Sequence, residues 1–296
     1  MNSFILYSYE FKGIKVPETP IDFPGWETID VEESVAKKQE IFGSFFQEDN
    51  FQEYFKLKNK TYHCRLAWQY NNVIVMQIEC KHKRKKSENF VDKIEDNYPW
   101  CYIIIDNRKD IQHITIQKNT SAFSKTDTVA KIIEYTLNAW LIKYRLSITV
   151  KPKYRSKIFW DLLDKYKAFG IKRITFKFAY PNVDWATKKI RELKDFASQS
   201  NGAVRLGVEA AKNELLDFEP TTKNKAMVDV CSGTGEDIEI KPNGLKAVHT
   251  SKEMNPIEVK MEPSLLSSID TDDLFDGKYE KTAEFLNTCK PFYDVQ

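Results

Sequence analysis

The sequence lacks the features that would place the protein in a membrane or on a secretory route. The longest uninterrupted apolar run spans only residues 100–105, whereas a membrane-spanning helix needs about 20 residues. The first residues show no basic stretch followed by an apolar run, so no secretory signal is expected. The 5 cysteines form no CxxC pair and their number is odd, which favours reduced thiols. The sequence therefore predicts a soluble, cytoplasmic protein without a membrane partner.

Strong catalytic motifs are also missing. No GxSxG, HExxH or dinucleotide-binding fingerprint occurs in the 296 residues, and only 4 histidines are present. Residues 231–235 (CSGTG) are rich in small residues but lack the ending of a phosphate-binding loop. We interpret them as a hairpin loop between two strands. The sequence leaves open whether the protein is an enzyme, and it predicts no cofactor.

The charge balance excludes a general electrostatic attraction to nucleic acids or membranes. Lys and Arg number 45 and Asp and Glu number 43, so the formal net charge is +2. Charge is nevertheless concentrated locally, because five of the six residues 81–86 (KHKRKK) are Lys or Arg. Such a run can neutralise several phosphates and release their counterions. A second basic cluster follows at residues 151–157.

These clusters predict that the protein binds the phosphate backbone of DNA or RNA through basic loops. Loops that contact phosphates give little selectivity among bases. The residues predicted to contact phosphates are Lys83, Arg84, Lys85, Lys86, Lys153 and Arg155.

The spacing of apolar residues predicts an α+β protein with antiparallel or mixed sheets and helices packed on one face. The strongest helix pattern lies between Ser124 and Leu141. Further helices are predicted at 28–46, 157–168, 184–199 and 282–287, and strands at 4–11, 102–106, 112–118, 147–150, 171–179 and 203–208.

We expect three segments along the chain. An N-terminal α+β domain covers residues 1–145, and an acidic tail covers residues 263–296. Between them, residues 146–262 alternate strands and helices and then form a meander of short strands from 226 to 261.

Residues 61–82 form the clearest predicted hairpin, with Asn71-Asn72 at the turn. A one-residue shift in pairing would turn every side chain to the opposite face. A two-residue loop would place Leu66 opposite Gln77, so we predict a three-residue loop, which keeps one face apolar. The predicted pairs are Leu66 with Ile78, Trp68 with Met76, Tyr70 with Ile74, and Cys64 with Cys80.

Two predicted strands alternate apolar and polar residues, which indicates sheets with one packed face and one open face. The polar sides carry Arg173, Thr175 and Lys177 in one strand, and His113, Thr115 and Gln117 in the other. An alternative function is therefore a non-enzymatic protein-interaction subunit. Its partner would bind the polar sheet face or the acidic tail.

A further alternative is a Mg²⁺-dependent nuclease. Three predicted strands end in Glu-x-Lys, at residues 79–81, 239–241 and 258–260. In such nucleases this acid and an upstream acid bind Mg²⁺, while the lysine positions the attacking water. Asp229 and Asp237 supply additional acids. The pattern is short in a chain rich in Glu and Lys, so no metal site is assigned.

Potential zinc ligands gather at the ends of the 61–82 hairpin, namely His63, Cys64, Cys80 and His82. The predicted register points both thiols into the apolar face and His63 to the other face. A tetrahedral site would then need a distorted backbone, so no zinc is predicted.

The middle of the chain, residues 100–182, resembles the core of uncharacterised bacterial proteins found at restriction and other anti-phage loci. The segments that carry the resemblance are WCYIIIDN (100–107), ITIQKN (114–119), SITVKPKY (147–154) and ITFKFAYPN (174–182), with the pairs AF (122–123), LN (137–138) and FW (159–160). The resemblance implies a cytoplasmic role in defence. It supplies no active-site residues.

Overall fold

A computed structural model describes residues 2–15, 29–109, 111–178, 204–262 and 278–290. The predicted helix at 184–199 and most of the acidic tail lie outside these residues.

The chain divides into two compact units. Unit 1 comprises Met1–Tyr7, Phe11–Val150 and Glu258–Thr288, and unit 2 comprises Ser8–Glu10, Lys151–Ile257 and Cys289–Gln296. The division near 150 falls close to the predicted boundary at 145. The return to unit 1 at Glu258 also falls close to the predicted boundary at 262, but Glu258–Thr288 belong to unit 1 rather than to a separate tail.

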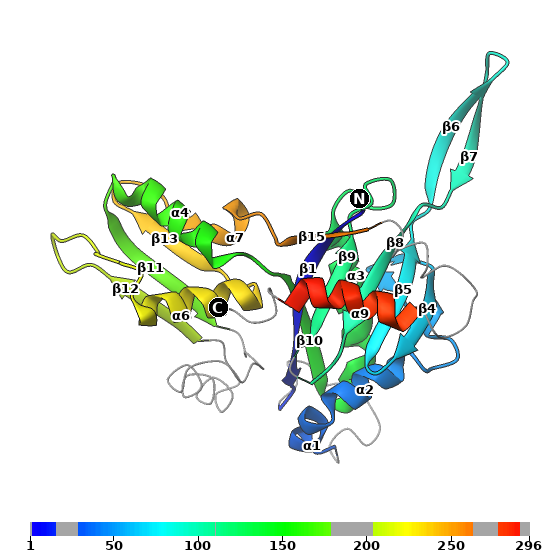
Figure 1. The fold of residues 1–296 in the computed structure, drawn as a ribbon, viewed down its shortest axis with the longest axis horizontal. Helices are drawn as coiled ribbons and strands as arrows, with labels where there is room; N and C mark the ends of the chain where they lie inside the picture. Colours follow the sequence, from blue (N-terminus) through cyan, green and yellow to red (C-terminus); the bar gives the residue numbers. More distant parts are fainter. Residues whose placement is uncertain (1, 16–28, 110, 179–203, 263–277, 291–296) are drawn as a thin grey trace. The chain divides into compact units, whose positions relative to one another are not determined.

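A seven-stranded sheet forms the centre of unit 1 (Figure 1). Its path runs β10-β1-β9-β8-β5-β4, and β15 pairs with β1 beside this path. The strands are β1 (Asn2–Gly13), β4 (Cys64–Tyr70), β5 (Val73–Glu79), β8 (Trp100–Asp106), β9 (His113–Gln117), β10 (Leu146–Pro152) and β15 (Glu258–Met261). The pairs β4–β5, β5–β8, β8–β9 and β1–β15 are antiparallel. The α+β class predicted from the sequence is confirmed.

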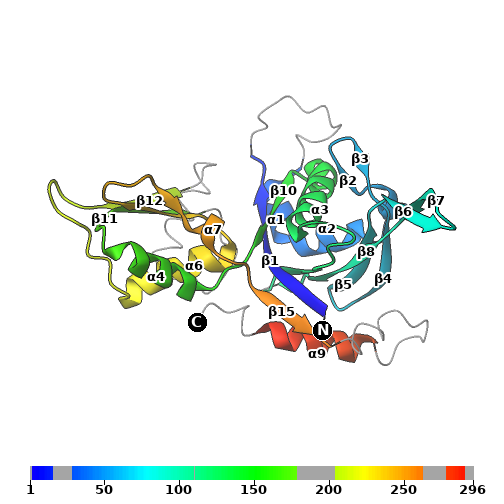
Figure 2. The ribbon, with the colours of Figure 1, turned by 90° about the horizontal axis from the view of Figure 1, so that it is seen from above.

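Helices cover both faces of this sheet, whereas the sequence predicts helices on one face (Figure 2). α3 (Thr126–Leu141) lies on one side and buries its apolar stripe. α9 (Lys278–Cys289) lies on the other side, where the ring of Phe285 is 5.2 Å from the ring of Phe4. The apolar stripe of α3 explains its burial.

All of β9 is buried, so the predicted open polar face of this strand is wrong. Thr115 donates a hydrogen bond to the carbonyl oxygen of Ile104 (3.3 Å). The side-chain oxygen of Gln117 accepts one from the amide of Tyr102 (3.0 Å). Polar side chains are tolerated in this core because they are hydrogen-bonded.

The remaining short elements of unit 1 surround the sheet. They are α1 (Val31–Ala36), α2 (Lys38–Phe45), η2 (Phe51–Glu53), β2 (Lys56–Leu57), β3 (Lys60–Thr61) and η3 (Ile142–Tyr144). Asp30 caps α1, because its carboxylate accepts a hydrogen bond from the amide of Glu32 (2.8 Å).

The β4–β5 hairpin has a two-residue turn, so the predicted three-residue loop is wrong. Asn71 and Asn72 both have positive φ, at 48° and 61°, as a tight primed turn requires. A β-bulge between Leu66 and Trp68 then shifts the register by one residue. The observed pairs are Tyr70 with Val73, Trp68 with Val75, Leu66 with Met76, and Cys64 with Ile78 rather than Cys80. The bulge places Trp68 and Tyr70 on the face of Val73 and Val75, and Cys64 and Leu66 on the opposite face with Met76 and Ile78.

Unit 2 is built on a four-stranded sheet in the order β12-β11-β13-β14. Its elements are α4 (Ser156–Lys167), β11 (Ile171–Phe178), β12 (Val204–Glu209), α6 (Thr222–Thr234), β13 (Ile238–Pro242), β14 (Val248–His249) and α7 (Thr250–Glu253). Residues of α4, α6, β11 and β13 form one apolar core, which includes Phe159, Phe176 and Ile240.

The start of the predicted meander is wrong, because α6 is a helix. Thr221 caps its first turn by accepting a hydrogen bond from the amide of Asn224 (3.3 Å). Gly235 ends it with φ at 71°. The predicted hairpin loop 231–235 is therefore the last turn of α6 and its glycine cap.

Candidate nucleic-acid interface

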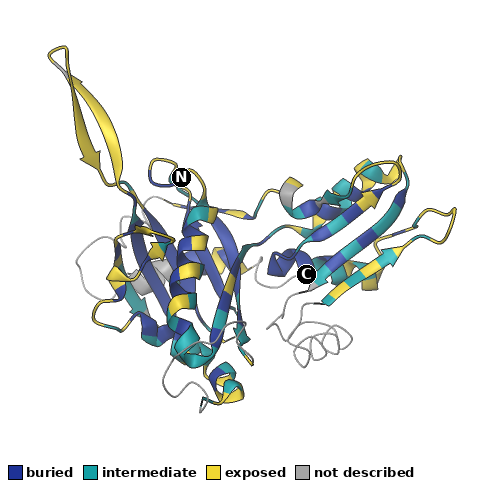
Figure 3. Ribbon diagram, turned by 180° about the vertical axis from the view of Figure 1, so that it is seen from behind, coloured by how far each residue is buried: buried dark blue, intermediate teal, exposed yellow. Residues whose placement is uncertain are grey.

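The basic run lies on an exposed two-stranded arm, which we define as residues 81–97. β6 (His82–Glu88) and β7 (Val91–Asn97) pair with each other in a separate sheet. Figures 1 and 3 show the arm projecting from unit 1, and every side chain of the arm whose burial is described is exposed. The sequence predicts basic loops here, whereas the residues form strands. An isolated two-stranded hairpin is marginally stable in water, so the arm is suited to contact a partner.

The arm ends in an unfavourable turn. Asn89 and Phe90 have positive φ, at 50° and 65°. This backbone conformation suits Gly or Asn and is costly for a bulky side chain. Phe90 is also fully exposed. A strained, solvent-exposed aromatic residue at the tip of an arm points to a role in binding rather than in packing.

One face of the arm is cationic. Antiparallel register places Lys86 directly opposite Lys93 and Arg84 opposite Glu95. Side chains two residues apart on a strand share a face, so Arg84, Lys86 and Lys93 lie together. Among the described residues, no carboxylate forms an ion pair with Arg84, Lys86 or Lys93. We call these three residues the cationic face.

Ion pairs gather on the other face of the arm. Lys81 lies 2.6 Å from Asp96, and Lys85 lies 2.6 Å from Asp92. A hydrogen bond from Lys85 lowers the pKa of Asp92, and one from Lys81 lowers the pKa of Asp96. Of the predicted phosphate contacts, Lys85 is therefore already paired within the arm. These pairs are exposed and contribute little to stability.

The whole arm keeps a modest positive charge. Residues 81–97 contain six Lys or Arg and four Asp or Glu, so their formal net charge is +2. Three cations without an ion pair lie on one face, beside Glu95, and Lys83 lies on the other face opposite Asp96, so each face can offer positive charge to a polyanion.

The two predicted contacts outside the arm belong to unit 2. Lys153 is 2% exposed, so its prediction as a phosphate contact is wrong. Its backbone carbonyl oxygen accepts a hydrogen bond from the amide of Ile257 (2.8 Å). Arg155 is exposed and precedes the first turn of α4.

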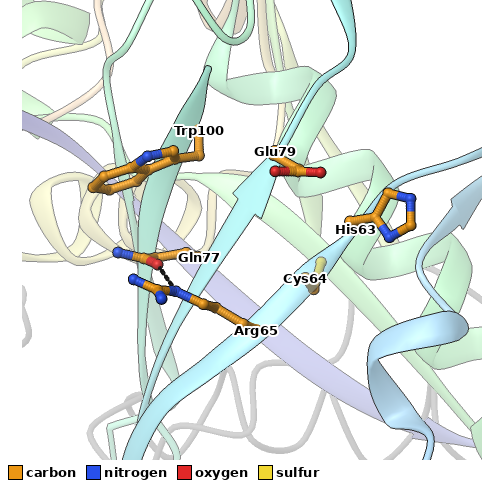
Figure 4. Close-up of a pocket in the computed structure, with 6 residues that line it drawn as sticks. All are labelled: His63, Cys64, Arg65, Gln77, Glu79 and Trp100. Atoms are coloured by element: carbon orange, nitrogen blue, oxygen red, sulfur yellow. Dashed lines mark hydrogen bonds between the residues drawn. The ribbon is translucent and has the colours of Figure 1, made fainter. Parts of the chain in front are cut away.

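A pocket of about 370 Å³ lies at the base of the arm (Figure 4). It is lined by His63, Cys64, Arg65, Gln77, Glu79 and Trp100. Glu79 ends β5 and Trp100 begins β8, and they form the last cross-strand pair before the chain enters the arm. Sequence reasoning missed this pocket, because it forms only where β8 pairs with the β4–β5 hairpin, and the sequence does not show that pairing.

The pocket holds neither a reactive thiol nor a metal cluster. Burial raises the pKa of Cys64 well above its usual value, so the sulfur stays protonated. Among the described residues, no group of three or more His, Cys, Asp or Glu side chains could hold a metal ion.

The acids of the predicted nuclease pattern have other partners. Glu239 lies 3.8 Å from Arg173, and Glu258 lies 3.4 Å from Lys118. Asp229 lies in α6 rather than in a strand. Lys177 on the predicted polar face is paired with Asp237 at 3.2 Å. Among the described residues these acids do not gather into a metal site, and on the polar side of β11 both Arg173 and Lys177 lie near a carboxylate.

Comparison of the sequence with models of protein families gives no match, and no curated protein matches it significantly. Within the described part of the chain, no helix has the length and apolar character needed to cross a bilayer.

Proposed function

We propose that the protein binds nucleic acid through the arm, with the cationic face against the phosphate backbone. The observation that carries this proposal is the cross-strand pair of Lys86 and Lys93. Like charges directly opposite each other destabilise a strand pair. Phosphate groups placed between them relieve that repulsion. A two-stranded ribbon can also enter a groove of duplex DNA.

The tip of the arm supports the same proposal. Proteins that deform nucleic acids insert apolar side chains between bases. Phe90 is fully exposed at the end of the arm, where it can act as such a wedge. The cations then hold the backbone on either side of the wedge.

The salt dependence of binding tests the proposal. Three cations that each displace one counterion give a slope of log affinity against log salt of about −2.7. Affinity for a labelled duplex should therefore fall about 40-fold between about 50 and about 200 mM salt. The variant Arg84→Ala/Lys86→Ala/Lys93→Ala should lose this dependence. Fluorescence anisotropy measures both quantities.

A matched control separates the arm from net charge. Lys109, Lys125 and Lys131 are exposed residues of unit 1 outside the arm. Their triple replacement by Ala changes the net charge equally and should leave affinity nearly unchanged. Equal losses of duplex affinity in the two triple variants would overturn the proposal. An absence of binding by the unchanged protein at about 50 mM salt would also overturn it.

We further propose a cytoplasmic role in bacterial anti-phage defence. The support is the resemblance of residues 100–182 together with the buried cysteines, which form no disulfide, as in proteins of reducing compartments. Phage plating on cells that express the protein tests this role. Protection should be lost with the arm variant, and an absence of protection by the unchanged protein would contradict it.

A second candidate function is that of a protein-interaction subunit. Phe90, Val91 and Ile94 are exposed apolar residues of the arm, and exposed apolar groups are common at protein interfaces. A complex captured from cells that survives nuclease treatment and requires these three side chains would favour this candidate over nucleic-acid binding.

A further inference from the structure

The pocket at the base of the arm combines an aromatic surface with charged groups of both signs. Trp100 is 38% exposed, and its ring lies edge-to-face with Tyr102 at a centroid distance of 4.9 Å. This contact fixes the orientation of the indole. An oriented, accessible indole is a platform on which a nucleic-acid base stacks.

A buried amide positions the cation of the pocket. The Nε atom of Arg65 donates a hydrogen bond to the side-chain oxygen of Gln77, which is 4% exposed. Figure 4 shows Trp100, Gln77 and Arg65 along one side of the pocket. A guanidinium held in this way is suited to bind phosphate, because its planar donors match the phosphate oxygens.

Across the pocket, Glu79 supplies an acceptor (Figure 4). A carboxylate repels phosphate but accepts hydrogen bonds from the exocyclic amino group of cytosine. Arg65 and Glu79 therefore select opposite ends of a ligand, one anionic and one carrying an amino group.

We infer that this pocket receives one unstacked nucleotide whose base carries an exocyclic amino group. The base stacks on Trp100, its amino group donates to Glu79, and its phosphate contacts Arg65. The volume of about 370 Å³ lies within the range of small-ligand pockets. The nucleotide is either free or part of a single strand. The second case rests on the proposed function, because the arm then delivers the strand.

Oligonucleotides test the strand-bound case. Single strands of about 15 cytidines or 15 thymidines fit the site sizes of single-strand binders. The unchanged protein should bind oligo-dC at least about fivefold more tightly than oligo-dT. Glu79→Gln should bring the affinities for oligo-dC and oligo-dT to the same value. Trp100→Leu should weaken binding of both strands at least about fivefold, whereas Trp100→Phe, which keeps a ring, should retain most of it.

Free nucleotides test the other case. Calorimetric titration should show binding of cytidine 5′-monophosphate, with much weaker binding of cytidine and of thymidine 5′-monophosphate. Arg65→Gln should remove the contribution of the phosphate, and Arg65→Lys should retain part of it. Thermal unfolding of each variant checks that it is folded.

The outcomes separate the pocket from the arm. The arm variant Arg84→Ala/Lys86→Ala/Lys93→Ala should weaken binding of both oligonucleotides equally and preserve the ratio of oligo-dC to oligo-dT. An equal affinity for the two strands in the unchanged protein, with no binding of cytidine 5′-monophosphate, would overturn the inference while leaving the proposed function intact. Binding of the mononucleotide without any binding of single strands or of the labelled duplex would uphold the pocket and overturn the function proposed for the arm.

Discussion

Lys86 and Lys93 face each other across the two strands of the arm, in a register that leaves no other residue between them. Opposed like charges weaken a hairpin that has no core of its own. The arm is therefore expected to be less ordered alone than when an anion lies across this pair.

Replacing Lys93 with Glu should convert the repulsive pair into an attractive one. The arm should become more ordered, and amide exchange in β6 and β7 should slow about two- to threefold. Nucleic-acid affinity should fall at the same time, because the cationic face loses charge. Hydrogen exchange followed by NMR measures the first effect. Exchange that is unchanged in this variant would show that the repulsion has no influence on the arm, and faster exchange would contradict the expected attraction.

Removing the acids of the opposite face should strengthen binding. Asp92 and Asp96 are held ionised by Lys85 and Lys81, which lower the pKa of each carboxyl group. The variant Asp92→Asn/Asp96→Asn releases both lysines at neutral pH and should steepen the salt slope by about 1.8.

The matched control for this experiment is Glu33→Gln/Glu219→Gln, which removes two other exposed, ion-paired acids. It should leave the salt slope unchanged.

The pH dependence of stability has a defined sign. Because the folded pKa values of Asp92 and Asp96 are lowered, their contribution to stability is present above about pH 4 and is lost as pH falls through the folded values.

The buried thiols should make the protein less stable in alkali. Burial raises the pKa of Cys101 to about 12, and it raises those of Cys64 and Cys231 well above their usual values. A raised folded pKa stabilises the protein below the unfolded value of about 8.5. This contribution should be lost between about pH 8.5 and about pH 12.

Thiol reactivity provides the measurement. At about pH 8, these three cysteines should react with a disulfide reagent only as fast as the protein unfolds, and denaturant should accelerate the reaction. Rapid modification of all three in the native protein would contradict their burial.

The glycine that ends α6 should resist substitution. Gly235 has φ at 71°, and a Cβ added there would lie 2.5 Å from the carbonyl oxygen of Pro152. Gly235→Ala should therefore lower the free energy of unfolding by clearly more than the ~1 kcal/mol of the left-handed backbone alone. Gly244 is the matched control, because its φ is 73° but nothing lies within 4 Å of an added Cβ. Chemical denaturation should show a larger loss at Gly235, and equal losses would exclude the steric effect.

Local patterns were sufficient to predict some elements but not their long-range contacts. The apolar residues of α3 recur at helical spacing, and α1 has acids in its first turn. Both helices form as these patterns predict. The small residues at 231–235 suggest a turn, yet the core of unit 2 buries them as a helix end. The sequence does not indicate the bulge between Leu66 and Trp68, because the extra residue could be inserted equally well at a neighbouring position of the strand.

The candidate site was predicted in part. The basic run was recognised from charge alone, although its strand conformation and the pairing of Lys85 with Asp92 depend on β7. The pocket could not be predicted, since Arg65, Glu79 and Trp100 meet only after three strands pair. Lys153 carries no sequence sign of burial, because its environment forms from elements that follow it in the chain.

The pairing of β1 with β15 has a consequence during translation. The amino-terminal strand leaves the ribosome early, but Glu258–Met261, which pair with it, and Phe285, which packs on Phe4, are synthesised much later. At typical elongation rates this delay is roughly 10 to 50 s. Throughout that time the nascent strand lacks its contacts with β15 and Phe285, so chaperone contact at this edge is the expected safeguard against misassembly on the polysome.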